Sequence, residues 1–174
     1  MGQREVLPRD GIQVFIPPAK LEPPAKKTDG MSVLIAEDDR DVRMVLHLVL
    51  RLDGHKVIEA STPKDALHRA AELRPDLIVL DLTFPGSEGF SALREMREAD
   101  STRDAPIIVI SGRARAEDQI WALEGGADVY LVKPFDPLEL METVRNIPRM
   151  TREEREGQRE KELDRLRQLA RPAG

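Results

Sequence analysis

The sequence predicts an α/β fold in which a five-stranded parallel sheet is doubly wound, with helices on both faces. Three observations predict it. Five short apolar runs alternate with five stretches of helical periodicity over residues 31–150. The run Leu77–Leu80 contains no polar residue, which is typical of a parallel strand buried on both faces. Glycine, proline and polar residues separate the runs, as they do in consecutive βαβ units.

The individual elements follow from these patterns in chain order. We predict strands at residues 33–36, 57–60, 77–80, 107–110 and 129–132. We predict helices at residues 41–52, 63–73, 90–97, 118–124 and from 137 to 144 or beyond. The first helix has an apolar stripe formed by Val42, Val45, Leu46, Val49 and Leu50. Gly54 ends this helix, while Thr62 and Pro63 are typical of a helix start.

Composition limits the class of protein. The chain has 174 residues, of which 34% are charged, and a formal net charge of -5, so the main partner is not expected to be nucleic acid. It contains no cysteine, which excludes disulfides, thiolate metal sites and a cysteine nucleophile. No apolar run is long enough to span a membrane, and no signal peptide is expected. We therefore expect a cytoplasmic protein.

Two segments flank the predicted domain. Residues 1–30 are rich in proline and are predicted to be an extended linker, although residues 12–16 are a weaker candidate for an added edge strand. Residues 151–174 form a charged tail in which pairs such as Glu162 and Arg165 favour a helix.

Apolar residues are sparse in this tail. Leu163, Leu166 and Ala170 supply one heptad of apolar seam, and a coiled coil normally needs three or four. A solvated helix or a frayed tail is therefore favoured over a dimer contact, and the oligomeric state stays open.

Polar side chains follow four of the predicted strands. Glu37, Asp38 and Asp39 follow the first strand. Asp81 follows the third, Ser111 the fourth and Lys133 the fifth. Carboxyl ends of parallel strands meet at one edge of a sheet, which is where ligands bind in open α/β folds. We therefore expect these groups to lie together.

Each group has a simpler interpretation when taken alone. The acidic run could cap the following helix, and Ser111 or Lys133 could belong to turns. Together, however, they match the needs of phosphoryl transfer. Clustered carboxylates favour Mg²⁺, lysine and serine contact phosphoryl oxygens, and an aspartate can form an aspartyl phosphate. Asp81 is the candidate nucleophile.

At this point the sequence resembles a response regulator receiver domain of two-component signalling, of the stand-alone, chemotaxis-regulator-like kind. The resemblance covers residues 31–150. It rests on VLIAEDD at 33–39, LIVLDLTFPGSEGF at 77–90, PIIVISG at 106–112 and GADVYLVKPF at 126–135. It implies a flavodoxin-like sheet with strand order 2-1-3-4-5.

The resemblance also implies roles for individual residues. Asp81 would be the phosphoacceptor, and Glu37, Asp38, Asp81 and the backbone carbonyl of Thr83 would hold Mg²⁺. Ser111 and Tyr130 would be the switch pair and Lys133 the phosphate-contacting lysine, with a cis peptide bond before Pro134. Thr83 and Arg113 occupy positions thought to tune phosphoryl loss, so slow autodephosphorylation is expected.

The implied partners are a histidine kinase or phosphotransfer protein, and a downstream protein that contacts the face formed by the fourth helix, fifth strand and fifth helix. In the implied switch, Tyr130 turns inward once Ser111 and Lys133 move toward the phosphoryl group. Two alternatives stay open. One is a docking module that never carries phosphate. The other, less favoured, is a Mg²⁺-dependent phosphohydrolase, because Thr83 stands where such enzymes carry a second aspartate. No enzymatic turnover of a substrate is expected.

Overall fold

The computed structural model describes residues 30–85 and 88–170. The predicted linker strand at residues 12–16, and the rest of residues 1–29, lie outside this range. Among the described residues, no helix is long and apolar enough to cross a membrane.

Within residues 30–85 and 88–170, five parallel strands form one sheet in the order β2-β1-β3-β4-β5. Their bounds are β1 Ser32–Ala36, β2 Lys56–Ala60, β3 Leu77–Asp81, β4 Ile107–Ser111 and β5 Val129–Val132. This confirms the predicted fold class and strand order. Every residue of β3 and β4 is buried, because helices cover both faces of these two central strands.

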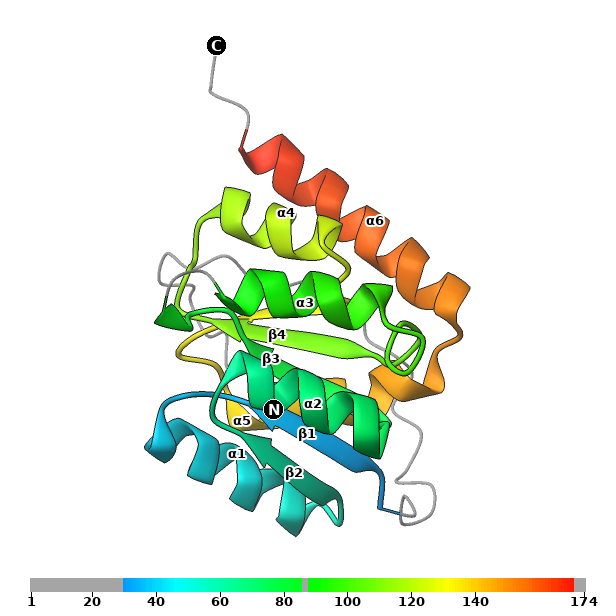
Figure 1. Ribbon diagram of the computed structural model, residues 1–174. Helices are drawn as coiled ribbons and strands as arrows, with labels where there is room; N and C mark the ends of the chain where they lie inside the picture. The colour runs from blue at the N-terminus through cyan, green and yellow to red at the C-terminus, as the bar shows by residue number, and fades with distance from the viewer. Residues whose placement is uncertain (1–29, 86–87, 171–174) are drawn as a thin grey trace, which may run out of the picture.

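In the described part of the chain, five α-helices cover the sheet and a sixth packs on the fourth of them (Figure 1). They are α1 Arg40–Leu52, α2 Pro63–Leu73, α3 Glu88–Glu98, α4 Ala116–Glu124, α5 Pro137–Asn146 and α6 Arg152–Leu169, with a 3₁₀ turn at Ile147–Arg149 between the last two. Figure 1 shows α2, α3 and α4 side by side on one face of the sheet. Helices α1 and α5 cover the other face, where they contact each other.

Alternation along the strands produces two apolar cores. In β1, Leu34 and Ala36 face the core under α2 and α3, while Val33 and Ile35 face the core under α1 and α5. The predicted stripe on α1 is wrong at Val45, which is half exposed. Leu46 and Leu50 alone are fully buried, because α1 covers the edge of the sheet with a narrow face.

Helix α6 is where the structure departs most from the sequence analysis. The solvated or frayed tail predicted there is wrong, since Leu163 and Leu166 are buried in the core cluster that includes Ala122 and Leu123 of α4. One heptad of seam is too short for a coiled coil, but two leucines are enough to fill a groove beside a neighbouring helix. A capping box of Thr151 and Glu154 begins the helix.

Candidate functional site

The candidate site lies at the carboxyl edge of the sheet. Asp81 is the last residue of β3, and Glu37 and Asp38 follow β1 directly. Ser111 ends β4, and Lys133 follows β5. The structure therefore brings all four strand ends to one edge, as the parallel topology predicts.

The carboxylate of Asp81 is buried and held from two sides. The backbone amide of Thr83 donates to Oδ1 at 2.8 Å, and the Thr83 hydroxyl lies 2.6 Å from each carboxylate oxygen. Lys133 Nζ donates to Oδ2 at 2.7 Å. Asp81 is 1% exposed, so these donors replace the water that an ionised carboxylate needs.

Lys133 joins two carboxylates from different strands. Besides Asp81, its ammonium donates to Oε2 of Glu37 at 2.8 Å. Burial lowers the pKa of Lys133, but the hydrogen bonds to Asp81 and Glu37 outweigh this and raise it above its usual range. The lysine is therefore charged, and it offsets part of the negative charge at this edge of the sheet.

Glu37, Asp38 and Asp81 form a carboxylate cluster that could hold a metal ion. One oxygen from each of the three residues lies within 4.8 Å of the others. Burial raises the pKa of Glu37 to about 7, and the neighbouring charge of Asp81 adds to this, against a hydrogen bond from Lys133. A hard divalent cation would relieve the repulsion between the carboxylates. The three carboxylates supply oxygen donors and Asp38 is exposed to solvent, which suits Mg²⁺ because this ion keeps several bound waters.

Asp39 lies outside this cluster. Its side chain accepts from the amides of Asp41 and Val42 at 2.8 and 3.0 Å and caps α1. These backbone hydrogen bonds hold the pKa of Asp39 below its usual range. The simpler interpretation of the acidic run, that it caps a helix, is thus right for Asp39.

The sequence analysis missed Arg43, which supports this loop. Its guanidinium donates to the carbonyls of Glu37 and Asp38 at 2.7 and 3.2 Å. It also reaches Glu59 of β2 at 3.4 Å. Nothing in the sequence distinguished Arg43 from other arginines on exposed helix faces.

Ser111 and Tyr130 both contact the backbone of Arg113. The amide of Arg113 donates to Ser111 Oγ at 3.2 Å, and the Tyr130 hydroxyl donates to the Arg113 carbonyl at 2.7 Å. Tyr130 is 4% exposed, and burial raises its pKa. The predicted inward turn of Tyr130 is therefore not available as a change from this structure, because the ring is already inside.

Further contacts surround these groups. The peptide bond between Lys133 and Pro134 is cis, as predicted. The amide of Lys133 donates to the Ser111 carbonyl at 2.8 Å, which ties the end of β5 to β4. Trp121 of α4 is 61% exposed and packs its ring against Phe90, with ring centroids 4.6 Å apart. Trp121 therefore packs on one side and is exposed on the other.

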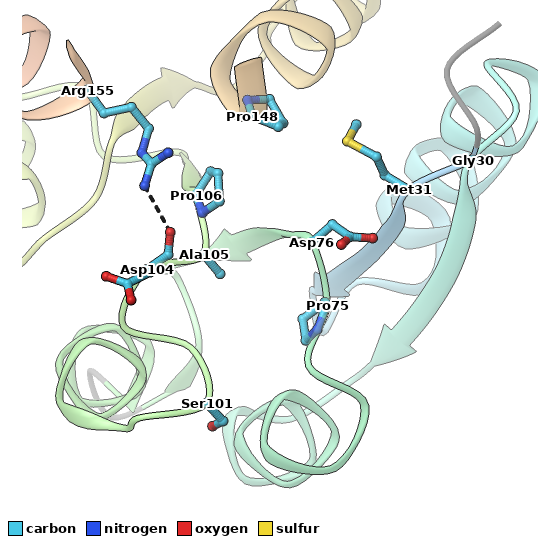
Figure 2. A pocket seen from close by; sticks show the side chains of 10 residues that line it. All are labelled: Gly30, Met31, Pro75, Asp76, Ser101, Asp104, Ala105, Pro106, Pro148 and Arg155. Carbon is cyan, nitrogen blue, oxygen red and sulfur yellow. Dashed lines mark hydrogen bonds between the residues drawn. The ribbon is translucent and has the colours of Figure 1, made fainter. Parts of the chain in front are cut away.

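A pocket of about 560 Å³ lies away from the site (Figure 2). Its lining includes Met31, Asp76 and Pro106, which are the residues immediately before β1, β3 and β4. The pocket is therefore at the amino edge of the sheet, opposite Asp81, and takes no part in the chemistry considered above.

Comparison with known proteins agrees with this geometry. A family model described as response regulator receiver domain matches residues 33–145. The phosphate regulon transcriptional regulatory protein PhoB of Escherichia coli is 34% identical over 117 residues, which are 67% of this chain and 51% of PhoB. The transcriptional regulatory protein PrrA of Mycobacterium tuberculosis is 43% identical over 67% of this chain and 49% of PrrA. The chain thus spans about half the length of these relatives.

Solved structures are similar over a larger share of their own length. A putative response regulator from Chloroflexus aurantiacus has a TM-score of 0.66 and 33% identity, covering 70% of this chain and 99% of that one. The receiver domain of the sensor histidine kinase PA1611 from Pseudomonas aeruginosa has a TM-score of 0.65 and 30% identity over 70% of this chain and 99% of its own. That structure holds a magnesium ion in its active site cleft.

Proposed function

Because the chain belongs to the response regulator receiver family of two-component systems, we propose that Asp81 accepts a phosphoryl group from a phosphohistidine. The donor is a histidine kinase or a phosphotransfer protein. The observation that carries the proposal is the carboxylate of Asp81, buried at a strand end and bonded to Lys133 at 2.7 Å. A purely structural aspartate at this place would not need two further carboxylates beside it.

The chemistry follows from these contacts. An oxygen of Asp81 attacks phosphorus in line, the new P–O bond forms as the P–N bond breaks, and the histidine nitrogen keeps the bonding electron pair. Glu37, Asp38, Asp81 and the Thr83 carbonyl would hold Mg²⁺, which supplies neutralising charge to the phosphoryl oxygens. Lys133 then binds a phosphoryl oxygen, and Ser111 donates its hydroxyl to another.

The output is a contact with another protein. Helix α4, edge strand β5 and helix α5 form the face that is expected to signal, as the resemblance implied. We place the protein in the cytoplasm, with residues 31–150 as the receiver domain, residues 1–30 as an extension and residues 151–174 as a helical tail. Neither nucleic acid nor a membrane is proposed as a partner of this chain.

One experiment separates this function from phosphate-independent docking. The full chain is incubated with Mg²⁺ and a small-molecule phosphodonor, and its intact mass is followed beside Asp81→Asn. We expect one phosphoryl group that requires both Mg²⁺ and Asp81. Asp38→Asn serves as the matched control, because it should slow the reaction by weakening metal binding while leaving the acceptor in place.

The opposite result has a clear meaning. No added mass with several donors, including histidine kinases, would favour the docking module. Continued turnover of an aryl phosphate would favour the phosphohydrolase. We also expect the phosphoryl group on Asp81 to persist, because Thr83 and Arg113 occupy the tuning positions, and a half-life of only seconds would contradict this.

A further inference from the structure

The two halves of α6 are attached to different parts of the molecule. In the first half, Arg155 is 7% exposed. Its guanidinium donates to the carbonyls of Met150 and Asp104 at 3.1 and 2.9 Å, the second of which Figure 2 shows, and it lies 3.4 Å from Asp128. These partners belong to loops at the amino edge of the sheet. The first half of α6 is therefore anchored to the frame of the domain.

The second half is attached to α4. Leu163 and Leu166 are 2% and 0% exposed and belong to the apolar cluster that contains Ala122 and Leu123. Arg167 reaches Glu124, the last residue of α4, at 2.9 Å. Figure 1 shows α4 lying between α3 and α6, so the second half of α6 covers a flank of α4.

Gly157 separates the two halves. A Cβ atom at this position would meet nothing within 4 Å, so packing does not require a glycine. Glycine inside a helix lowers its stability, because the unfolded backbone has more freedom to lose. The helix is thus weakest between its anchor at Arg155 and its contact with α4.

At the end nearest Asp81, helix α4 is tied to the preceding loop by Gln119, which donates to the Ala114 carbonyl at 3.0 Å, and by the ion pair between Asp118 and Arg113. It has nine residues, and its N-cap residue Arg115 makes no side-chain capping hydrogen bond. The loop before it is held by the Arg113 peptide, which bonds Ser111 on its amide side and Tyr130 on its carbonyl side. A phosphoryl group that accepts from the Ser111 hydroxyl would pull this oxygen toward Asp81 and so lengthen the hydrogen bond that it accepts from the Arg113 amide.

We propose that α6 is an intramolecular strap over α4, and that phosphoryl transfer to Asp81 releases its second half while Arg155 holds the first. The inference rests on the proposed function, since the trigger is the phosphoryl group. Before transfer, the strap covers one flank of the helix that is expected to signal. After transfer, residues 163–169 leave that flank, and both the α4 surface and the two leucines become accessible.

Hydrogen–deuterium exchange of the full chain tests this, with the phosphoryl content of the same sample read by intact mass. We expect the backbone amides of residues 158–169 to exchange at least about fivefold faster in the phosphorylated protein, the lower end of ordinary coupling between sites. Residues 152–157 should not change. Asp81→Asn treated with the same donor should match the untreated chain throughout.

Leu166→Ala and Leu169→Ala form a matched pair on the same helix, because Leu169 is 58% exposed. Leu166→Ala should exchange fast in residues 158–169 before any donor is added, and phosphorylation should add less than about twofold. Leu169→Ala should behave as the parent chain. Arg167→Ala, which removes the ion pairs to Glu124 of α4 and to Asp164 of the same helix, gives the same comparison if Leu166→Ala does not fold.

The outcomes separate the two proposals. A phosphoryl adduct on Asp81 with unchanged or slower exchange in residues 158–169 overturns the strap and leaves the proposed function intact. Equal acceleration in both halves of α6 also overturns it, because the anchor at Arg155 is then not an anchor. Absence of any adduct overturns the proposed function, and the trigger with it.

Discussion

Lys133 and Asp81, which lie 52 positions apart in the chain, share a hydrogen bond of 2.7 Å at the carboxyl edge of the sheet. The same ammonium holds Glu37 at 2.8 Å, so one cation serves two buried carboxylates. This arrangement stabilises the fold as well as the site, because without Lys133 the buried carboxylates would keep only donors from Thr83 and Asp39 and would have no cation beside them.

Lys133→Met should therefore lower stability in metal-free buffer. We expect a loss of about 1–3 kcal/mol in the free energy of unfolding, below the range for a fully buried pair because the lysine side chain is 22% exposed. Added Mg²⁺ should restore part of the loss by supplying positive charge. Urea unfolding with and without Mg²⁺ measures both effects. Lys64→Met is the control. Lys64 is exposed on the surface of α2, so this change should alter stability by less than about 0.5 kcal/mol.

Asp38→Asn should weaken Mg²⁺ binding without weakening the metal-free fold. Asp38 is exposed, and its carboxylate accepts one hydrogen bond, from the Asp39 amide at 3.1 Å. Ligand binding to the folded state raises stability, so the increase in melting temperature on adding Mg²⁺ should shrink in the variant. An unchanged Mg²⁺-dependent increase would show that Asp38 is not a ligand, and a large loss of stability without metal would show that Asp38 also supports the metal-free fold.

Asp128 connects three elements through one buried carboxylate. Its Oδ2 accepts from Arg97 at 2.6 Å and from the Ile107 amide at 2.8 Å, and its Oδ1 lies 3.4 Å from Arg155 of α6. Asp128→Ala leaves two largely buried guanidinium groups without their partner, so we expect a loss of about 3 kcal/mol or more in urea unfolding. Asp118→Ala, at a partly exposed ion pair of 3.5 Å with Arg113, is the control and should cost less than about 1 kcal/mol.

The ion pair between Arg145 and Asp53 should make the free energy of unfolding depend on pH in the acid range. Arg145 Nε donates to Asp53 Oδ2 at 2.9 Å across α1 and α5, and this hydrogen bond holds the pKa of Asp53 below its usual range. A lowered folded-state pKa stabilises the protein above the ordinary value near 3.8, and that contribution disappears as the pH falls through the folded pKa. We expect Arg145→Gln to cost about 0.5–1 kcal/mol at pH 7, since the arginine is half exposed.

The same comparison in acid checks the cause. The difference in unfolding free energy between Arg145→Gln and the parent chain should shrink between pH 5 and about pH 2.5. An equal difference at both pH values would mean that Arg145 stabilises the chain by packing alone.

Gly157→Ala and Gly126→Ala should have opposite signs. A Cβ at Gly157 meets open space inside α6, so alanine should raise stability by about 0.5–1 kcal/mol. Gly126 has a φ of +104°, and a Cβ there would lie 2.6 Å from Cγ of Arg97, so alanine should destabilise. Thermal unfolding of the two variants measures both. If Gly157→Ala does not raise the melting temperature, or lowers it, α6 needs its glycine.

Much of the fold was predictable because it depends on local patterns. The apolar runs that became β3 and β4 are continuous, and the observed strands differ from the predicted ones by one residue, Asp81 and Ser111 being included. Helix ends were less predictable. Helix α3 begins at Glu88 rather than Phe90, because first-turn residues carry no apolar signal.

The candidate site was predictable for a different reason. Glu37, Asp81, Ser111 and Lys133 each follow a strand, and parallel strands place their carboxyl ends at one edge whatever the rest of the chain does. Residue spacing alone did not decide which acid faces that edge, although the family resemblance implied Glu37 and Asp38. Asp38 joins the cluster and Asp39 caps α1, since the turn into the helix rotates adjacent side chains to different sides.

The sequence by itself determined the alternation of strands and helices, the parallel sheet and the set of polar groups at its edge. These features depend on residue type and short-range spacing. Only the tertiary structure decided that Lys133 bridges Glu37 and Asp81, that Tyr130 lies inside, and that α6 packs on α4. The physical reason is that each of these is a contact between elements far apart in the chain, and its free energy depends on which surfaces remain uncovered once the sheet and its helices have packed.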